Sequence, residues 1–200
     1  MAGLIGVFGG TFDPPHVGHL ILADEGQAAL GLEKVLWVVT GVPPHKPDAP
    51  LSHLEVRLRM VRAAIAGNAA FEISRADIDR PAPHYAVGTM AWLRERMPGA
   101  HFVYLIGSDS LRDLPAWHTP TEFLSACAAL GVMHRPGAKV DLAALETQIP
   151  GLAEKVRIFE APLVGVSGRD IRERVRTGAP YRYLVPQAVA EIILEERLYR

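Results

Sequence analysis

The sequence is poor in cysteine and has no excess of charge of either sign. Its 200 residues include one cysteine, Cys127, so an internal disulfide is excluded. Lys and Arg number 21 against 22 for Asp and Glu, and this balance offers no electrostatic case for a nucleic-acid or membrane-surface partner. No apolar run reaches the roughly 18 residues of a transmembrane helix, and Met1–Phe8 lacks the basic segment of a signal peptide. We therefore expect a cytoplasmic protein in which Cys127, flanked by alanines, lies in the core.

Short apolar segments alternate with longer amphipathic ones along a chain that is 49% apolar. The predicted strands are Leu4–Phe8, Val35–Val39, Phe71–Arg75, Phe102–Ile106, Ala129–Met133 and Val156–Glu160. The predicted helices are Val17–Leu30, Ser52–Ala66, Ala86–Met97, Ser167–Thr177 and Pro186–Glu196. This order predicts an α/β fold, a Rossmann-like doubly wound parallel sheet with helices on both faces. We expect a single domain over residues 1–200, with a C-terminal helical part (about 166–200) packing on the sheet.

Two of these predicted segments carry local expectations. Ser52 and Glu55 have the spacing of a capping box, which would satisfy free N–H groups at the start of the second helix. Glu55 can also pair with Arg59 one turn further on. Trp37 in a strand and Trp92 in a helix are expected to pack in the core.

The first predicted strand leads into eleven residues rich in Gly, Pro and His, GGTFDPPHVGH. The two glycines let the backbone turn sharply and approach a ligand, and the helix that follows presents its N-terminus to an anion. His16 and His19 share one helix face, which suits them to bind phosphate oxygens and neutralise charge. The alternative is a zinc half-site, for which His45 could be a third ligand but no cysteine pair or carboxylate cluster completes the set. We therefore predict a phosphate site. Its residues are Gly9, Gly10, Thr11, Phe12, His16 and His19, the two histidines being catalytic.

Two further cationic clusters follow later strands, where ligands of parallel sheets bind. Lys46 in the loop after the second strand is a flexible charge able to reach a phosphate, although an exposed loop lysine is usually solvated. Ser167 is a good N-cap, and Arg169 and Arg172 lie one turn apart and can share a triphosphate. The alternative for this cluster is a solvated basic helix with an ordinary cap.

The segment GGTFDPPHVGH resembles the signature of the nucleotidyltransferase superfamily with the His/Thr-x-Gly-His motif. Its Phe-Asp-Pro-x-His form is similar to that of bacterial nicotinate-mononucleotide adenylyltransferases, whereas pantetheine-phosphate adenylyltransferases usually carry threonine at the position of His16. Correspondences extend from Gly6 to the final Arg-Leu-Tyr-Arg. The resemblance implies that ATP and nicotinate mononucleotide are the substrates, that Mg²⁺ arrives with ATP, and that nicotinate adenine dinucleotide and pyrophosphate are the products.

The resemblance also implies roles on the ATP side of the site. Lys46 matches a lysine that contacts phosphate. The segment Ser167–Arg172 is similar to the family's Ile-Ser-Ser-Thr/Arg-x-Ile-Arg segment, with Gly168 in place of the second serine. His134-Arg135-Pro136-Gly137 resembles a Ser-Arg-Pro-Gly segment on the nucleotide side, which makes Arg135 a further candidate.

On the mononucleotide side, Tyr85 matches a Ser/Thr-Tyr-Thr segment that lines the family's pyridine pocket, while His84 and Ala86 depart from it. Asp109 matches the family's Gly-x-Asp, which touches ligand; an acid at a strand end can accept from ribose hydroxyls or cap the next helix. Trp117 offers a flat ring on which a pyridine can stack, or it packs in the core. The predicted mononucleotide contacts are Tyr85, Gly107, Asp109 and Trp117.

Three other functions are alternatives to this one. Nicotinamide mononucleotide or phosphopantetheine could be the acceptor, although Trp117 and the Pro83–Tyr85 loop disfavour the latter. A non-catalytic nucleotide-binding sensor on the same fold is the rival of a different class. The histidine pair and three further cations disfavour a sensor, which has no leaving group to neutralise. The resemblance implies that backbone N–H groups around Tyr85–Ala86 and Trp117–His118 face the pyridine substituent, which predicts a preference for the acid over the amide.

Overall fold

A parallel sheet organises the structure, a computed structural model that describes residues 3–43, 51–134 and 140–200. Within these residues the sheet has six strands in the order β3-β2-β1-β4-β5-β6, and every adjacent pair is parallel. The strands are β1 (Leu4–Gly10), β2 (Leu32–Val39), β3 (Phe71–Ser74), β4 (His101–Gly107), β5 (Ala129–Met133) and β6 (Val156–Phe159). The order reverses between β1 and β4, so the predicted doubly wound α/β fold is confirmed.

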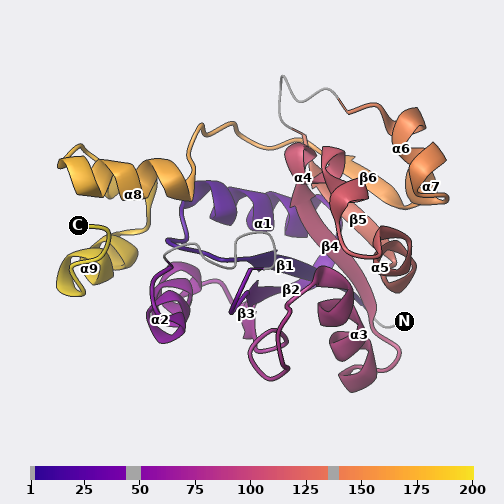
Figure 1. Cartoon of the computed structure of the whole chain (residues 1–200), viewed down its shortest axis with the longest axis horizontal. Helices are drawn as coiled ribbons and strands as arrows, with labels where there is room; N and C mark the ends of the chain where they lie inside the picture. The colour runs from indigo at the N-terminus through magenta and orange to yellow at the C-terminus, as the bar shows by residue number, and fades with distance from the viewer. Residues whose placement is uncertain (1–2, 44–50, 135–139) are drawn as a thin grey trace.

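Helices connect the strands and cover both faces of the sheet (Figure 1). The α-helices are α1 (Val17–Ala29), α2 (Leu54–Ile65), α3 (Ala86–Arg96), α4 (Ser108–Arg112), α5 (Pro120–Ala126), α6 (Leu142–Gln148), α7 (Leu152–Lys155), α8 (Gly168–Thr177) and α9 (Gln187–Glu195). Two single 3-10 turns, η1 (Leu114–Ala116) and η2 (Arg182–Leu184), complete the elements. Among the described residues no helix is long and apolar enough to cross a membrane.

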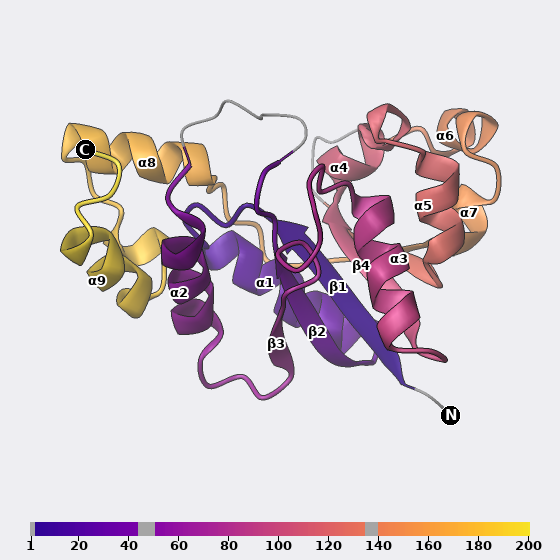
Figure 2. The same ribbon diagram turned by 60° about the horizontal axis from the view of Figure 1, so that its bottom comes forward.

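Alternate residues of each central strand enter two separate cores, because side chains of a strand point to opposite faces. Leu36 and Val38 pack with residues of α3, α5 and α6 on one face. Val35, Trp37 and Val39 pack with residues of α1 and α2 on the other. Figure 2 shows α3 and α5 side by side on their face. Both faces are apolar, which explains why the strand sequences read as continuous apolar runs.

Element boundaries follow the predictions to within three residues at each end, with one group of omissions. The short helices α4 to α7, which have between four and seven residues, are absent from the predicted elements. So few turns cannot produce a recognisable apolar stripe. Asp141 nonetheless caps α6 by accepting a hydrogen bond from Ala144 N–H at 3.0 Å, a signal that the sequence contained.

The predicted capping box at α2 is wrong. The helix begins at Leu54 with His53 as its N-cap, and no side chain caps it. Ser52 instead donates its backbone N–H to the Asp13 carboxylate at 3.1 Å. Arg59 pairs with Glu195 and Glu196 of the C-terminal segment rather than with Glu55. A tertiary contact thus replaces both the predicted Ser52–Glu55 capping box and the predicted Glu55–Arg59 pair.

The C-terminal helices lie beside α2 (Figures 1 and 2). Met60 of α2 packs with Ile171 of α8 and with Val189 and Ile193 of α9 in a third apolar cluster. Gly178 ends α8 in the left-handed conformation, with φ 72°, as a helix C-terminus often requires. α2 in turn contacts β2 and β3, so it connects the C-terminal helices to the sheet.

The predicted core positions of Trp37 and Cys127 are confirmed. Trp37 is fully buried, and Trp92 is partly buried with the Arg96 guanidinium over its ring at 4.1 Å. Cys127 donates its thiol to the Phe123 carbonyl at 3.3 Å. Burial raises the pKa of this thiol to about 12.

We expect Cys127 to be inert toward thiol reagents in the folded protein. Because the thiolate is the reactive form and its pKa is raised, almost none is present at mildly alkaline pH. A colorimetric thiol assay should detect no rapid reaction before denaturation and one thiol per chain after it. Labelling of the folded protein at the rate of an exposed thiol would contradict this placement.

Candidate active site

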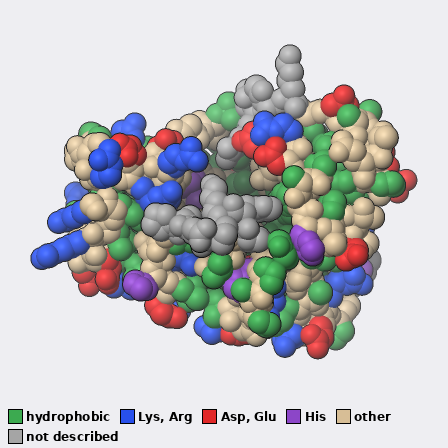
Figure 3. Space-filling model, viewed as in Figure 1, with side chains coloured by type: hydrophobic (Ala, Val, Ile, Leu, Met, Phe, Trp, Pro, Cys, Tyr) green, Lys and Arg blue, Asp and Glu red, His purple; other side chains and the backbone are tan. Residues whose placement is uncertain are grey.

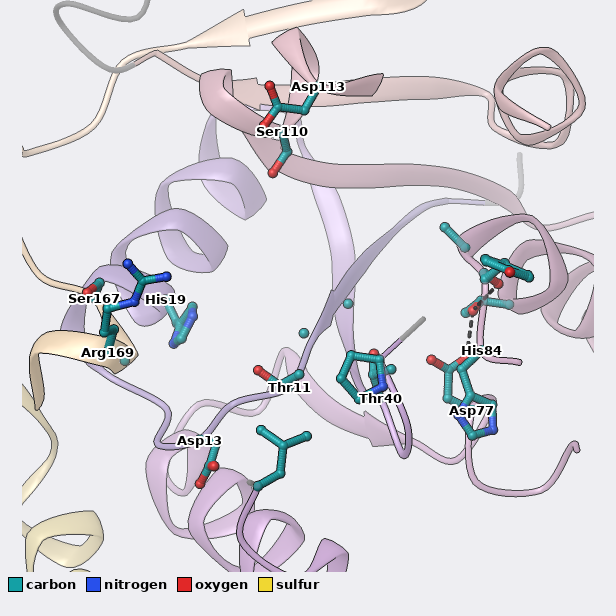
Figure 4. A pocket seen from close by; sticks show the side chains of 18 of the residues that line it. Thr11, Asp13, His19, Thr40, Asp77, His84, Ser110, Asp113, Ser167 and Arg169 are labelled. Carbon is teal, nitrogen blue, oxygen red and sulfur yellow. Dashed lines mark hydrogen bonds between the residues drawn. The ribbon is translucent and has the colours of Figure 1, made fainter. Parts of the chain in front are cut away.

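A cavity of about 1070 Å³ opens where the strand order reverses, at the carboxyl ends of β1 and β4. This is the expected ligand position in a doubly wound sheet, and the volume suits a large ligand. The lining comes from the β1–α1 turn, the ends of β2 and β3, the start of α3, the α4–α5 region and the start of α8. Figure 4 shows His19, Ser167 and Arg169 on one side of the cavity and Asp77 and His84 on the opposite side.

The β1–α1 turn positions the two histidines. His16 is the N-cap of α1, and its backbone N–H donates to Nδ1 of His19 at 3.2 Å. The two rings stack with centroids 3.6 Å apart. Because Nδ1 of His19 accepts, the neutral ring carries its proton on Nε2 and acts there as a donor. His19 lines the cavity, while His16 is buried behind it.

The N-terminus of α8 forms the cationic wall next to these histidines. The predicted cap is confirmed, since the Ser167 hydroxyl accepts from Asp170 N–H at 3.1 Å. Gly168 lets this helix approach the β1–α1 turn closely: a Cβ at this position would lie 3.3 Å from the Asp13 carbonyl oxygen. Ser167, Gly168 and Arg169 line the cavity, and Figure 3 shows Lys and Arg side chains gathered over α8 at the left of the view.

Asp13 joins three distant segments beneath this wall. Its carboxylate accepts from Ser52 N–H at 3.1 Å and from the Tyr199 hydroxyl at 2.6 Å. Its carbonyl accepts from the Arg172 guanidinium at 2.7 Å. Burial, and then the charge of Asp13, raise the pKa of Tyr199, so this phenol stays protonated and donates. Arg172 therefore holds the turn in place as well as lining the cavity.

Arg57 fixes the loops that follow β1 and β2. Its guanidinium is almost fully buried and donates to the carbonyls of Thr11, Thr40, Gly41 and Ser52 at distances of 2.9, 2.6, 2.9 and 3.0 Å. Burial lowers the pKa of Arg57, which the nearby Asp13 carboxylate partly offsets. The Arg57 side chain thus fixes the spacing between the two loops.

The opposite end of the cavity is aromatic. Tyr85 stacks on His118 with ring centroids 4.1 Å apart, and both line the cavity. Trp117 is partly buried, packs against Tyr104 and Phe123, and also lines the cavity, so its two proposed roles are both compatible with the structure. Flat rings of this kind suit an aromatic base or a pyridine ring.

A buried ion pair stiffens the loop before α3. Arg80 donates through Nη2 to the Asp77 carboxylate at 2.9 Å, to the Tyr85 carbonyl at 3.0 Å and to the Thr89 hydroxyl at 3.1 Å. The Thr89 hydroxyl in turn donates to Asp77 at 2.6 Å. The charge of Asp77, which lines the cavity, is therefore neutralised by Arg80.

The structure brings most of the predicted site residues together. The predicted residues that line the cavity are Gly9, Gly10, Thr11, His19, Tyr85, Trp117, Ser167, Arg169 and Arg172. Phe12 and His16 are buried behind it. Gly107 and Asp109 belong to the β4–α4 junction outside the lining, where Asp109 lies 3.8 Å from Arg112; Ser110 and Asp113 face the cavity instead. Lys46 and Arg135, like His45, lie outside the described residues.

Sequence reasoning missed Asp13, Arg57, Asp77, Arg80 and Tyr199. Arg57 belongs to an amphipathic helix, and an arginine in such a helix is ordinarily solvated rather than buried. Tyr199 is far from Asp13 in the chain, and nothing local marks the pair. Asp13 stood inside the recognised motif, so its position was available as a signal. Among the described residues, no group of three or more His, Cys, Asp or Glu side chains could hold a metal ion.

Comparison with known proteins agrees with this architecture. A model of the cytidylyltransferase-like family matches residues 7–174. Proteins of Thermomicrobium roseum and of a Roseiflexus species, each named probable nicotinate-nucleotide adenylyltransferase, are both 43% identical to this chain. Each alignment covers 98% of this chain, and 91% and 98% of the two relatives respectively.

A solved structure with a similar fold is the Plasmodium falciparum nicotinic acid mononucleotide adenylyltransferase complexed with NaAD. Its TM-score is 0.80 at 17% identity, with 98% of this chain and 97% of that chain covered. At this identity the likeness supports the fold alone. The fold, the glycine-rich turn with its histidine pair and the family match define a nucleotidyltransferase of the cytidylyltransferase-like class. Within that class, the chain belongs to the nicotinate-nucleotide adenylyltransferase family.

Replacing Arg57 by Met should destabilise the protein by about 3 kcal/mol, because it leaves four buried carbonyls without their donor. Urea unfolding measures this change. Arg59→Met is the matched control on the same helix. Arg59 is partly exposed and, among the described residues, forms its ion pairs with Glu195 and Glu196, so its loss should cost less than about 1 kcal/mol. Equal effects of the two substitutions would show that the carbonyl contacts of Arg57 are not important for stability.

Proposed function

We propose that this chain transfers the adenylyl group of ATP to nicotinate mononucleotide, a step of NAD biosynthesis. Residues 1–200 act as one nucleotidyltransferase domain, and the reaction takes place in the cytoplasm. The observation that carries the proposal is the cavity at the reversal of strand order, which joins a histidine-lined and arginine-lined end to an aromatic end. A nucleoside triphosphate and a pyridine mononucleotide require these two environments side by side.

The reaction is a displacement at phosphorus. A phosphate oxygen of nicotinate mononucleotide attacks the α-phosphorus of ATP, the bond to the β-phosphate oxygen breaks, and pyrophosphate leaves. Such a transfer needs alignment of the two phosphates and neutralisation of charge rather than a protein nucleophile. His19, as a donor at Nε2, and the arginines of α8 are suited to that task.

Mg²⁺ belongs with ATP in this proposal. The residues described offer no cluster of acidic or histidine side chains to hold a metal ion, whereas Mg²⁺ binds readily through phosphate oxygens and water. The ion would reduce the negative charge of the triphosphate. Positioning of that triphosphate falls to His19, Arg169 and the N-terminus of α8, with Lys46 and Arg135 as further proposed contacts.

Recognition of the acid is assigned to the start of α3. Tyr85 is the N-cap of this helix and Ala86 its first residue, so the Ala86 N–H lies at the positive end of the helix dipole and beside the cavity. A pyridine carboxylate accepts from such donors, and the pairing of Asp77 with Arg80 removes net negative charge from the same wall. A carboxamide would turn its own NH₂ toward those donors and leave them unpaired.

Nicotinate mononucleotide should be used about a hundredfold more efficiently than nicotinamide mononucleotide. Two mismatched hydrogen bonds at about 1–3 kcal/mol each produce a preference of this order. The measurement is kcat/KM for each substrate at fixed ATP and Mg²⁺, with the dinucleotide identified by mass and pyrophosphate release measured in parallel. Phosphopantetheine serves as the negative control. No dinucleotide with either pyridine substrate would refute the proposed function, and a ratio near one would refute only the specificity.

Replacing His19 by Ala should lower kcat about 100- to 1,000-fold and leave the fold intact, since one preorganised donor to developing charge is lost. His101→Ala is the control, because His101 is exposed at the start of β4. Initial rates at saturating substrates, with circular dichroism of each variant, make the comparison. Near-normal turnover in a folded His19→Ala protein would exclude a catalytic role for this ring.

A further inference from the structure

His84 lies between two loops that form the mononucleotide end of the cavity. One loop is Thr40–Pro43, which follows β2, and the other is Arg80–Tyr85, which precedes α3. His84 is buried and lines the cavity next to Asp77 (Figure 4).

Both ring nitrogens of His84 are used, and each contacts a different loop. Nδ1 accepts a hydrogen bond from the Val42 backbone N–H at 3.0 Å. Nε2 lies 3.3 Å from the Arg80 carbonyl oxygen, which can only accept. The ring is therefore neutral, with its proton on Nε2, and it bridges the two loops through their backbones.

The ring also packs closely against the first loop. A Cβ added at Gly41 would lie 2.9 Å from Cε1 of His84 and 3.3 Å from Nδ1. Such a contact is too close for a side chain, so Gly41 provides the space that the imidazole occupies. The His84 ring can therefore occupy its position only because residue 41 has no side chain.

Arg57 holds the same loop from the opposite side. It donates to the carbonyls of Thr40 and Gly41 at 2.6 and 2.9 Å, while His84 accepts from the next N–H along the chain. The Gly41–Val42 peptide group is therefore held at its carbonyl by Arg57 and at its N–H by His84, two side chains from different elements. Thr40 and Pro43, at either end of this segment, line the cavity.

We propose that His84 is a positioning residue that fixes the Thr40–Pro43 loop against the Arg80–Tyr85 loop and so holds the mononucleotide end of the cavity in its binding geometry. This inference rests on the proposed function for its substrate. His84 is not assigned a chemical step. The contact exists equally in the ground state and in the transition state, so its loss raises KM for the mononucleotide rather than lowering kcat.

The test compares His84→Leu with His84→Asn, which have side chains of nearly equal size. An Asn carbonyl can occupy the position of Nδ1 and accept from Val42 N–H, whereas Leu cannot. We expect His84→Leu to raise KM for nicotinate mononucleotide about tenfold and to change kcat by less than about threefold. His84→Asn should restore most of the loss. If His84→Asn is as impaired as His84→Leu, or if His84→Leu is normal, the positioning role is overturned.

Gly41→Ala provides a second and independent test. On its own it forces the His84 ring away and should raise the same KM, because the added methyl and the ring compete for one space. Combined with His84→Ala, which removes the ring, it should cause no further loss. Additive effects of the two substitutions would contradict the proposed contact.

Hydrogen exchange at the Val42 amide tests the contact without reference to turnover. Exchange should be faster in His84→Leu than in the wild type and close to wild type in His84→Asn. Unchanged exchange in His84→Leu would overturn the proposal even if KM rises. If the wild type forms no dinucleotide, the proposed function fails, while the exchange measurement still decides whether His84 fixes the loop.

Discussion

The site depends on one buried cation that lies outside the cavity. Arg57 donates hydrogen bonds to four backbone carbonyls in the segments after β1, after β2 and before α2, and so holds these three segments together. A guanidinium is suited to this because its five N–H donors are fixed in one plane. The carbonyls of irregular loops would otherwise be buried without donors, which is costly. These loops can therefore be irregular and line a cavity, because Arg57 of α2 supplies the N–H donors that neighbouring strands would supply within the sheet.

Arginines of the polar network around the cavity support the backbone of its loops. Arg57, Arg80 and Arg172 direct donors at backbone carbonyls. His19 of α1 and Arg169 of α8 line the cavity beside the β1–α1 turn. Arg57 and Arg172 hold that turn through the carbonyls of Thr11 and Asp13. Reactive groups need little reorganisation when their supports are already satisfied, which is the condition for electrostatic stabilisation of a developing charge. The consequence is that Arg57, Arg80 and Arg172 stabilise the fold with donors that could otherwise bind a ligand.

Local signals predicted the parts of this protein that depend on local sequence. The glycine-rich turn, the histidine pair and the Ser167 cap are each contained in a few consecutive residues, and the structure confirms the cap and brings the turn to the cavity. The Ser52–Glu55 capping box failed because Asp13, a residue distant in sequence, competes for the Ser52 N–H. Arg57 and Tyr199 could not be found by such reasoning, since their partners are defined only by the fold. Nothing in the sequence indicated Ser110 and Asp113 either, which line the cavity because α4 begins directly at the end of β4.

The hydrogen bond between Asp13 and Tyr199 spans 186 positions of the chain. Of the six strands of the described sheet, β1 ends before Asp13 and the other five lie between the two residues, the last of them, β6, ending at Phe159. Every pair of neighbouring strands, β1 with β4 included, is closer in sequence than Asp13 and Tyr199. We therefore expect the sheet to form before the Asp13 contact, which needs the return of the C-terminal segment. Long-range contacts of this kind are entropically expensive and form late. We therefore expect the β1–α1 turn to reach its final geometry after the scaffold is built, so that a chain with native secondary structure is not yet a competent catalyst.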